Sequence, residues 1–314
     1  MKAVRPAQGD PKVADCREQK TKKRAVILYG QGIISISCLL ALSGTLIAAE
    51  GNRSEKTFEA APNPRITVTN ARGQILVRGW DKPQVHIVYT VTSPYVEVDT
   101  EAIPPNGSPD KIHFATHFLD PLVSGRDQTV DYSLDVPTGT DLEIRDTQGG
   151  VRIEKVQGDD ASVESVGGAI LVSDFTGHLF LRSIGGNIDV IRPSGRVEAY
   201  SITGNLHFVS PTTSKLRGTT TSGRILFEGD FRDGGDYSLS EYSGDMEILC
   251  PPSASFELNA KTDRGKLVNE MPMTIRHQQA TPVSSANSLF GTHLTGKATV
   301  NLRSFSGTIR IRER

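Results

Sequence analysis

Two histidines four residues apart, His113 and His117 in KIHFATHF, are the pair in the sequence that most suggests metal chemistry. On a helix, this spacing would place both imidazoles on one face, where they could share a zinc ion. On a strand the two residues would be about 13 Å apart, too far to share one ion. Apolar residues flank both histidines, which favours a strand or a loop over a helix. We therefore do not expect the two histidines to share a metal ion.

A row of small hydroxyl residues is the second feature that could do chemistry. These residues stand three positions before a recurring glycine: Ser165, Ser183, Ser201, Thr220, Thr262 and Ser304, with Asp146 and Glu241 at the same position in two further units. A catalytic serine needs a base beside it, and no histidine or carboxylate recurs at a spacing that would supply one. We therefore interpret the row as structural, each hydroxyl accepting a turn N–H that would otherwise be buried without a partner.

The recurring glycines define a repeat of 18–21 residues. The structural turn glycines are Gly149, Gly168, Gly186, Gly204, Gly223 and Gly244, and Gly73, Gly265 and Gly307 fit the same register. In the eight units from Gly149 onwards, the residues seven before and two after the glycine are all apolar. The positions between are polar or mixed, and this period-two alternation is typical of half-buried strands. Each unit therefore predicts two short strands separated by a glycine turn.

This repeat predicts an all-β fold, a single-domain β-solenoid of about nine coils. An antiparallel meander would also pair neighbouring strands, but it has no reason to keep matching columns in every unit, whereas a solenoid stacks each column on itself. We expect the solenoid to span residues 65–314, with irregular insertions at 92–127 and 270–295. The final coil, ATVNLRSFSGTIRIR, is expected to close the array.

Residues 1–49 are predicted to be a cytoplasmic head followed by a hydrophobic leader helix. A basic cluster, Lys22, Lys23 and Arg24, precedes 25 uncharged, mostly apolar residues. This pattern indicates a signal peptide cut near Ala48–Ala49 or an uncleaved membrane anchor, with the basic flank in the cytoplasm. Both alternatives place the β domain outside the cytoplasm. Residues 50–64 read as a polar linker.

Composition excludes several classes of function. Without residues 1–49 the chain holds 27 basic and 33 acidic residues, a net charge of −6, which argues against a nucleic-acid partner. Two of the three cysteines, Cys16 and Cys38, lie in the leader. The third, Cys250, follows a predicted strand and is interpreted as core filling rather than as a nucleophile. No spacing of residues indicates a cofactor, a metal or a phosphate-binding loop.

Three segments carry a family resemblance: ITVTNARGQILVRGWD, VPTGTDLEI and GKATVNLRSFSGTIRIR. They resemble the DUF4097 family, described as adhesin-like, β-strand-repeat envelope proteins, over residues 63–314. The resemblance implies a β-solenoid, a bacterial origin and a location in the cell envelope. It supplies no catalytic residue.

The outward positions of the repeat mix charges without a dense cluster. Phe180 and Tyr200 are outward on adjacent coils and form the possible binding surface, since aromatic side chains can stack on sugars. We therefore expect an exported, non-enzymatic, adhesin-like binding or scaffolding module with an envelope protein or a glycan as partner. The alternative is a carbohydrate-active enzyme, a polysaccharide lyase or hydrolase, on the same scaffold. Self-association is a third possibility.

Overall fold

The computed structural model describes residues 51–119, 128–274 and 287–314. The chain divides into two compact units, Met1–Leu46 and Ile47–Arg314, and every described residue belongs to the second. The predicted leader at 1–49 therefore lies outside the described residues, together with Cys16 and Cys38. Within the described ranges, no helix is long and apolar enough to cross a membrane.

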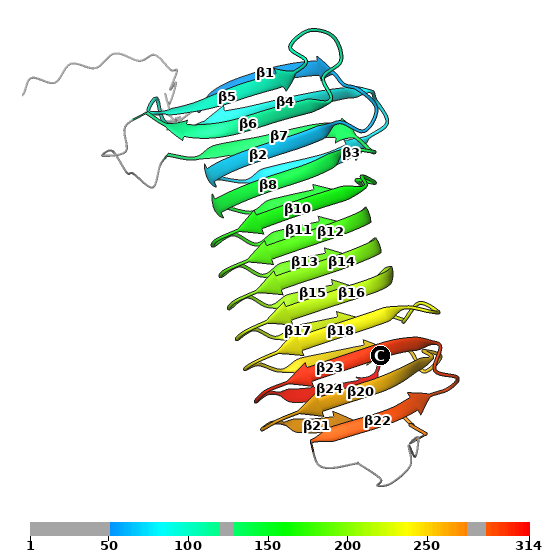
Figure 1. Ribbon diagram of the computed structural model, residues 1–314. Coiled ribbons are helices and arrows are strands. Elements are labelled where there is room, and N and C mark those ends of the chain that lie inside the picture. Colours follow the sequence, from blue (N-terminus) through cyan, green and yellow to red (C-terminus); the bar gives the residue numbers. More distant parts are fainter. Residues whose placement is uncertain (1–50, 120–127, 275–286) are drawn as a thin grey trace, which may run out of the picture. The chain divides into compact units, whose positions relative to one another are not determined.

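The second unit consists of two facing sheets of twelve strands each (Figure 1). Sheet A contains, in spatial order, β1 (Asn52–Glu59), β4 (Gln84–Val91), β7 (Val130–Pro137), β3 (Ile75–Trp80), β9 (Val151–Glu154), β11 (Ile170–Ser173), β13 (Ile188–Ile191), β15 (Leu206–Val209), β17 (Ile225–Glu228), β19 (Met246–Cys250), β24 (Thr308–Glu313) and β21 (Lys266–Asn269). Sheet B contains β22 (Ser288–His293), β20 (Phe256–Thr262), β23 (Ala298–Ser304), β18 (Asp236–Glu241), β16 (Thr212–Thr220), β14 (Ser194–Ser201), β12 (Thr176–Ser183), β10 (Asp160–Ser165), β8 (Asp141–Gln148), β2 (Arg65–Arg72), β6 (Lys111–Phe118) and β5 (Val96–Ile103). The core lies between the sheets.

The repeat columns stack directly on themselves, as predicted. Ile170 pairs with Val151 on one side and Ile188 on the other, and all three side chains are buried. The strands of successive coils run parallel, which excludes the meander for the central array. A strand in sheet B, a glycine corner and a strand in sheet A make one coil, and a wider turn leads to the next. The β-solenoid prediction is confirmed.

The glycine corners confirm the structural interpretation of the serine row. The N–H of Gly186 donates to Ser183 Oγ at 2.9 Å, and that of Gly204 donates to Ser201 Oγ at 2.8 Å. The same bond joins Gly168 to Ser165. These hydroxyls are buried at the corner and occupied by the backbone, so none of them is placed to attack a substrate.

The N-terminal end of the array departs from the simple repeat. β6 and β7 add a tenth parallel layer beyond β2 and β3, so the predicted insertion at 92–127 supplies part of the solenoid itself. β4 and β5 then pair antiparallel with this layer, and β1 pairs antiparallel with β4. The segment expected to be a linker, 50–64, thus contains a strand, because β1 satisfies the backbone groups of the edge strand β4.

The C-terminal end corrects a further expectation. The last coil in sequence, β23 and β24, does not close the array. It lies between the coil of β18 and β19 and the coil of β20 and β21. β22, from the predicted irregular insertion at 270–295, pairs antiparallel with β20 at the outer edge. The layer at the end of the array therefore comes earlier in the sequence than the layer next to it, which is made of the C-terminal strands.

The tandem glycines Gly185 and Gly186 offer a matched test of corner packing. A Cβ on Gly186 would overlap the carbonyl oxygen of Gly168 in the coil below, whereas a Cβ on Gly185 would lie 3.5 Å from the nearest atom, the carbonyl oxygen of Val166. We expect Gly186→Ala to lower the free energy of unfolding by about 3 kcal/mol or more, and Gly185→Ala to change it by less than about 1 kcal/mol. Denaturant unfolding monitored by circular dichroism measures both. Equal effects of the two substitutions would contradict the stacked-corner packing.

Candidate binding surface

Phe180 and Tyr200, the predicted surface pair, lie together on the outer face of sheet B. They come from β12 and β14, and their ring centroids are 5.6 Å apart with an interplanar angle of 44°. Both side chains are partly exposed. Alternation along each strand points the neighbouring Leu179 and Ala199 into the core, so the packing of the core holds both rings outward.

A carboxylate beside the two rings holds the Tyr200 ring in place. Glu198 pairs with Phe180 in the sheet register. Its carboxylate accepts a hydrogen bond from the Tyr200 hydroxyl at 2.9 Å and forms an ion pair with Arg196 at 2.5 Å. Burial alone would raise the pKa of Glu198, but the hydrogen bonds from Tyr200 and Arg196 outweigh it and lower the pKa. Burial and the bond to Glu198 raise the pKa of the Tyr200 hydroxyl. Glu198 is therefore ionised and engaged, not a free catalytic acid.

A groove of 330 Å³ runs beside this pair. It is lined by outward and corner residues of β2, β8, β10 and β12: Thr69, Asn70, Arg145, Asp146, Thr147, Glu164, Ser165, Val166, Arg182 and Ile184. Arg182 pairs with Tyr200 in the sheet register, so the groove ends next to the rings. The groove crosses the strands and therefore follows the stacking direction of the coils.

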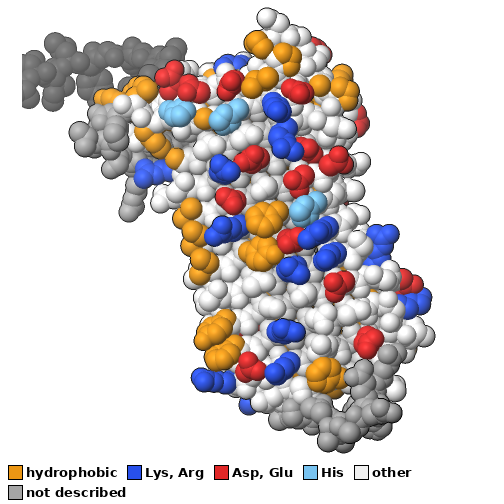
Figure 2. All heavy atoms as spheres, viewed as in Figure 1, with side chains coloured by type: hydrophobic (Ala, Val, Ile, Leu, Met, Phe, Trp, Pro, Cys, Tyr) orange, Lys and Arg blue, Asp and Glu red, His pale blue; other side chains and the backbone are white. Residues whose placement is uncertain are grey.

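An apolar stripe along the glycine corners was missed by the sequence reasoning. Val166, Ile184 and Ile202 stand two residues before successive glycines and are 46%, 44% and 46% exposed. Further along, Tyr242 and Phe305 stack with centroids 4.5 Å apart. Figure 2 shows this face, with hydrophobic side chains midway along it and a further row following one edge. The signal was present in the sequence as apolar residues at turn positions, where polar ones are usual.

The other residues considered for chemistry are placed differently. His113 and His117 both lie on β6, a strand, and His117 contacts Asp99 of β5 at 3.2 Å. In the described part of the chain, no group of three or more His, Cys, Asp or Glu side chains could hold a metal ion. Cys250 is fully buried, and burial raises the pKa of its thiol to about 12, so it fills the core as predicted.

Two buried acids, Asp146 and Glu241, replace the hydroxyl at their corners. Asp146 is 4% exposed and Glu241 is 5% exposed. Their carboxyl oxygens make no well-formed hydrogen bond to any described residue. Burial raises the pKa of Asp146 to about 7, and the backbone N–H of Thr147 opposes only part of that shift. Burial also raises the pKa of Glu241. Although raised pKa values mark general acids, the carboxyl oxygens of both residues are covered, including those of Asp146 in the lining of the groove.

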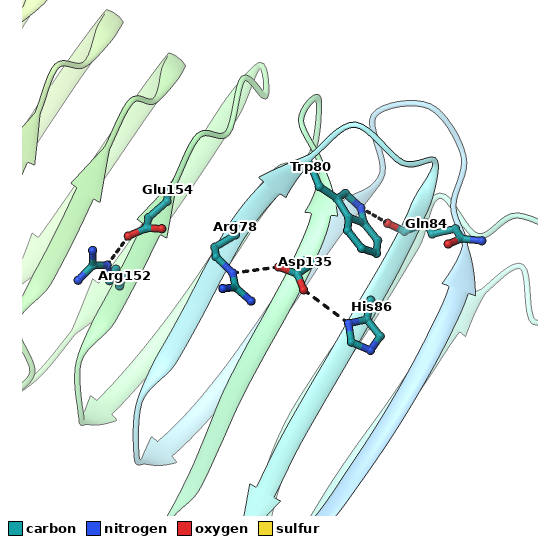
Figure 3. A network of polar contacts seen from close by, with 7 residues as sticks. All are labelled: Arg78, Trp80, Gln84, His86, Asp135, Arg152 and Glu154. Carbon is teal, nitrogen blue, oxygen red and sulfur yellow. Dashed lines mark hydrogen bonds and ion pairs between the residues drawn. The ribbon is translucent and has the colours of Figure 1, made fainter.

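The outer face of sheet A carries a polar network of a different kind (Figure 3). Arg78 contacts Asp135 at 2.9 Å, and His86 lies between Asp135 at 3.5 Å and Glu55 at 3.0 Å. The Trp80 ring stacks over His86. These contacts link β1, β4, β7 and β3 side by side, and Arg78 and Asp135 form an ion pair within them. The network therefore joins the N-terminal strands of sheet A.

Comparison with known proteins adds only distant likenesses. No protein-family model matches the chain, and no curated protein matches it. A solved structure of a putative cell adhesion protein from Clostridium sporogenes covers 84% of this chain and all of its own, at 10% identity and a TM-score of 0.27. Putative adhesins from Parabacteroides distasonis and Bacteroides fragilis also cover 84% of this chain, and 98% and 99% of their own. Both are 10% identical, with TM-scores of 0.44 and 0.43. The resemblance to the DUF4097 family stays a prediction.

The buried carboxyl group of Asp146 predicts a pH-dependent stability. A carboxyl whose pKa is raised on folding stabilises the native state fully below the unfolded value near 4, and this contribution is lost as pH rises to about 7. Asp146→Ser gives this corner the hydroxyl group that the corners of the neighbouring coils carry. We expect it to raise the free energy of unfolding by roughly 1–4 kcal/mol at pH 8 and much less at pH 4. Thermal unfolding from pH 4 to 8 tests this, with the exposed Asp159→Ser as control. An unchanged pH profile in Asp146→Ser would show that the buried group is not protonated.

Proposed function

We propose that this protein is an exported, non-enzymatic, adhesin-like binding module of the bacterial cell envelope, and that it binds an extended glycan on the outer face of sheet B. The observation that carries the proposal is the pair of partly exposed rings, Phe180 and Tyr200, at the end of a groove that crosses the strands. The basic cluster and apolar run at residues 22–49 support export.

The direction of the groove favours an extended polymer over a compact ligand. Successive strands in a sheet are about 4.8 Å apart, which is close to the length of one pyranose unit in an extended chain. A glycan lying across β8, β10, β12 and β14 would therefore place about one sugar over each coil. The apolar faces of two of its sugars would contact Phe180 and Tyr200, while the corner stripe of Val166, Ile184 and Ile202 would border the chain.

The carboxyl groups favour binding over cleavage. Glycoside hydrolysis uses two acids flanking one bond, one of them protonated and able to reach the leaving oxygen. Beside the rings, Glu198 is ionised and engaged with Tyr200 and Arg196. The acids with raised pKa values, Asp146 and Glu241, are buried at the corners. This arrangement supports the non-enzymatic proposal over the lyase or hydrolase alternative.

The proposal is tested with the full-length chain in a polyoxyethylene detergent, which carries no sugar. Binding to an array of extended polysaccharides is measured beside release of new reducing ends and of unsaturated products. We expect binding without product, and a loss of about tenfold or more in affinity in the double variant Phe180→Ala and Tyr200→Ala, since one stacked ring contributes on the order of 1 kcal/mol. Tyr95→Ala removes an exposed aromatic at the N-terminal end and is the matched control.

Two results would contradict this proposal. Cleavage of any polysaccharide would support the enzyme alternative. If the Phe180 and Tyr200 double variant bound as tightly as the unsubstituted protein, the binding site would have to lie elsewhere. Sedimentation at several protein concentrations, run in parallel, shows whether self-association accounts for apparent multivalent binding.

A further inference from the structure

The outer face of sheet B is locally basic around the two rings, although residues 50–314 are acidic overall. The central outward positions of β12, β14 and β16 are His178, Phe180, Arg182, Arg196, Glu198, Tyr200, Lys215, Arg217 and Thr219. They include four Lys or Arg side chains and one carboxylate, while on the flanking strands Glu164 lies beside Arg182 and Asp236 lies beside Lys215 in the register. Figure 2 shows both basic and acidic side chains around the hydrophobic ones midway along the face.

The positive charges on this face are only partly compensated. Arg196 is paired with Glu198. Arg182 and Lys215 form no ion pair with any residue that the structure describes, and Arg217 lies against the Tyr200 hydroxyl. By contrast, on sheet A, Arg78 and Arg152 are each paired with a carboxylate, as Figure 3 shows. Unpaired guanidinium and ammonium groups beside a ligand platform are suited to anionic groups.

The register places these cations where a stacked sugar would carry its substituents. Arg182 lies directly beside Tyr200 on the next strand, and Arg217 lies beside Glu198 on the strand beyond. A sugar stacked on Tyr200 would thus have a guanidinium on each neighbouring coil. Arg182 and Arg217 lie on strands that are two apart, so anionic groups on alternate sugars would meet a cation about every 9.6 Å along the stack.

We propose that the glycan bound at Phe180 and Tyr200 is anionic, with carboxylate or sulfate groups that contact Arg182, Arg217 and Lys215. This inference rests on the proposed function, because it names the class of glycan held at the same surface. A neutral glycan would leave Arg182 and Lys215 without an ion pair to any residue that the structure describes. Nucleic acid offers a similar negative charge, but its phosphates lie along a backbone and its flat bases, not its sugars, stack on aromatic rings.

The experiment compares polymers that differ only in charge. Polygalacturonate and its methyl-esterified form share a backbone, dextran sulfate supplies sulfate in place of carboxylate, and oligo-dT is a polyanion without free sugar faces. Affinities are measured by isothermal titration calorimetry at several salt concentrations, with the full-length chain in the same detergent. The variants are Arg182→Gln with Lys215→Gln, and Arg152→Gln on sheet A as a control with the same type of charge change.

We expect polygalacturonate or dextran sulfate to bind at least tenfold more tightly than the esterified polymer, with an affinity that falls as salt increases. The pair of Arg182→Gln and Lys215→Gln should reduce that affinity about tenfold and flatten its salt dependence, while Arg152→Gln leaves both nearly unchanged. The relative binding of polygalacturonate and dextran sulfate tells carboxylate from sulfate.

The possible failures are distinguishable. Equal binding of the esterified and charged polymers, with no effect of the Arg182 and Lys215 changes, would overturn the anionic preference and leave glycan binding intact. Absence of binding to every polysaccharide would overturn the proposed function itself. Binding of oligo-dT as tightly as the acidic glycans, in competition with them, would show a general polyanion site and overturn this inference.

Discussion

Each coil passes between the two sheets through a corner at which backbone lies directly on backbone. The carbonyl oxygen of Gly168 occupies the space that a Cβ on Gly186 would need, and the same holds for Gly186 and Gly204. The hydroxyl of Ser183 then satisfies the N–H that the tight corner turns inward. Because every corner must meet the next at the same distance, the strands stack in parallel and in register, and the two outer faces become flat and periodic.

A flat periodic face can recognise a ligand only through its outward side chains, since the shape of the backbone changes little from coil to coil. On sheet A several outward charges are paired, as Arg78 is with Asp135 and Arg152 is with Glu154. On sheet B two rings lie outward at β12 and β14, and beside them Arg196 is paired with Glu198, whereas Arg182 and Lys215 form no ion pair with a described residue. The scaffold therefore fixes the spacing of any ligand groups, whereas a few substitutions at outward positions fix its chemistry.

The central coils and the surface pair could be predicted from the sequence, because the length of the repeat shows which residues of neighbouring coils lie side by side. Period-two alternation places Phe180 outward, and the 18-residue spacing puts it beside the coil of Tyr200. The insertion of β23 between β18 and β20 could not be predicted, because each of these strands carries the same apolar columns and would fit either neighbour. The strand β1 could not be predicted either, since its residues are mostly exposed, half of them are charged, and only its pairing with β4 makes it a strand.

The ends of the array bear on how such a module acts. An open solenoid edge is a template for another chain, and natural proteins protect it with charge and with antiparallel strands. Here β1 carries Arg53, Glu55, Lys56 and Glu59 along the edge of sheet A. Lys56 also reaches across to β5, donating to Thr100 at 3.1 Å, so a polar contact joins the two sheets above the apolar core. These features oppose the addition of further coils at the N-terminal end of the array.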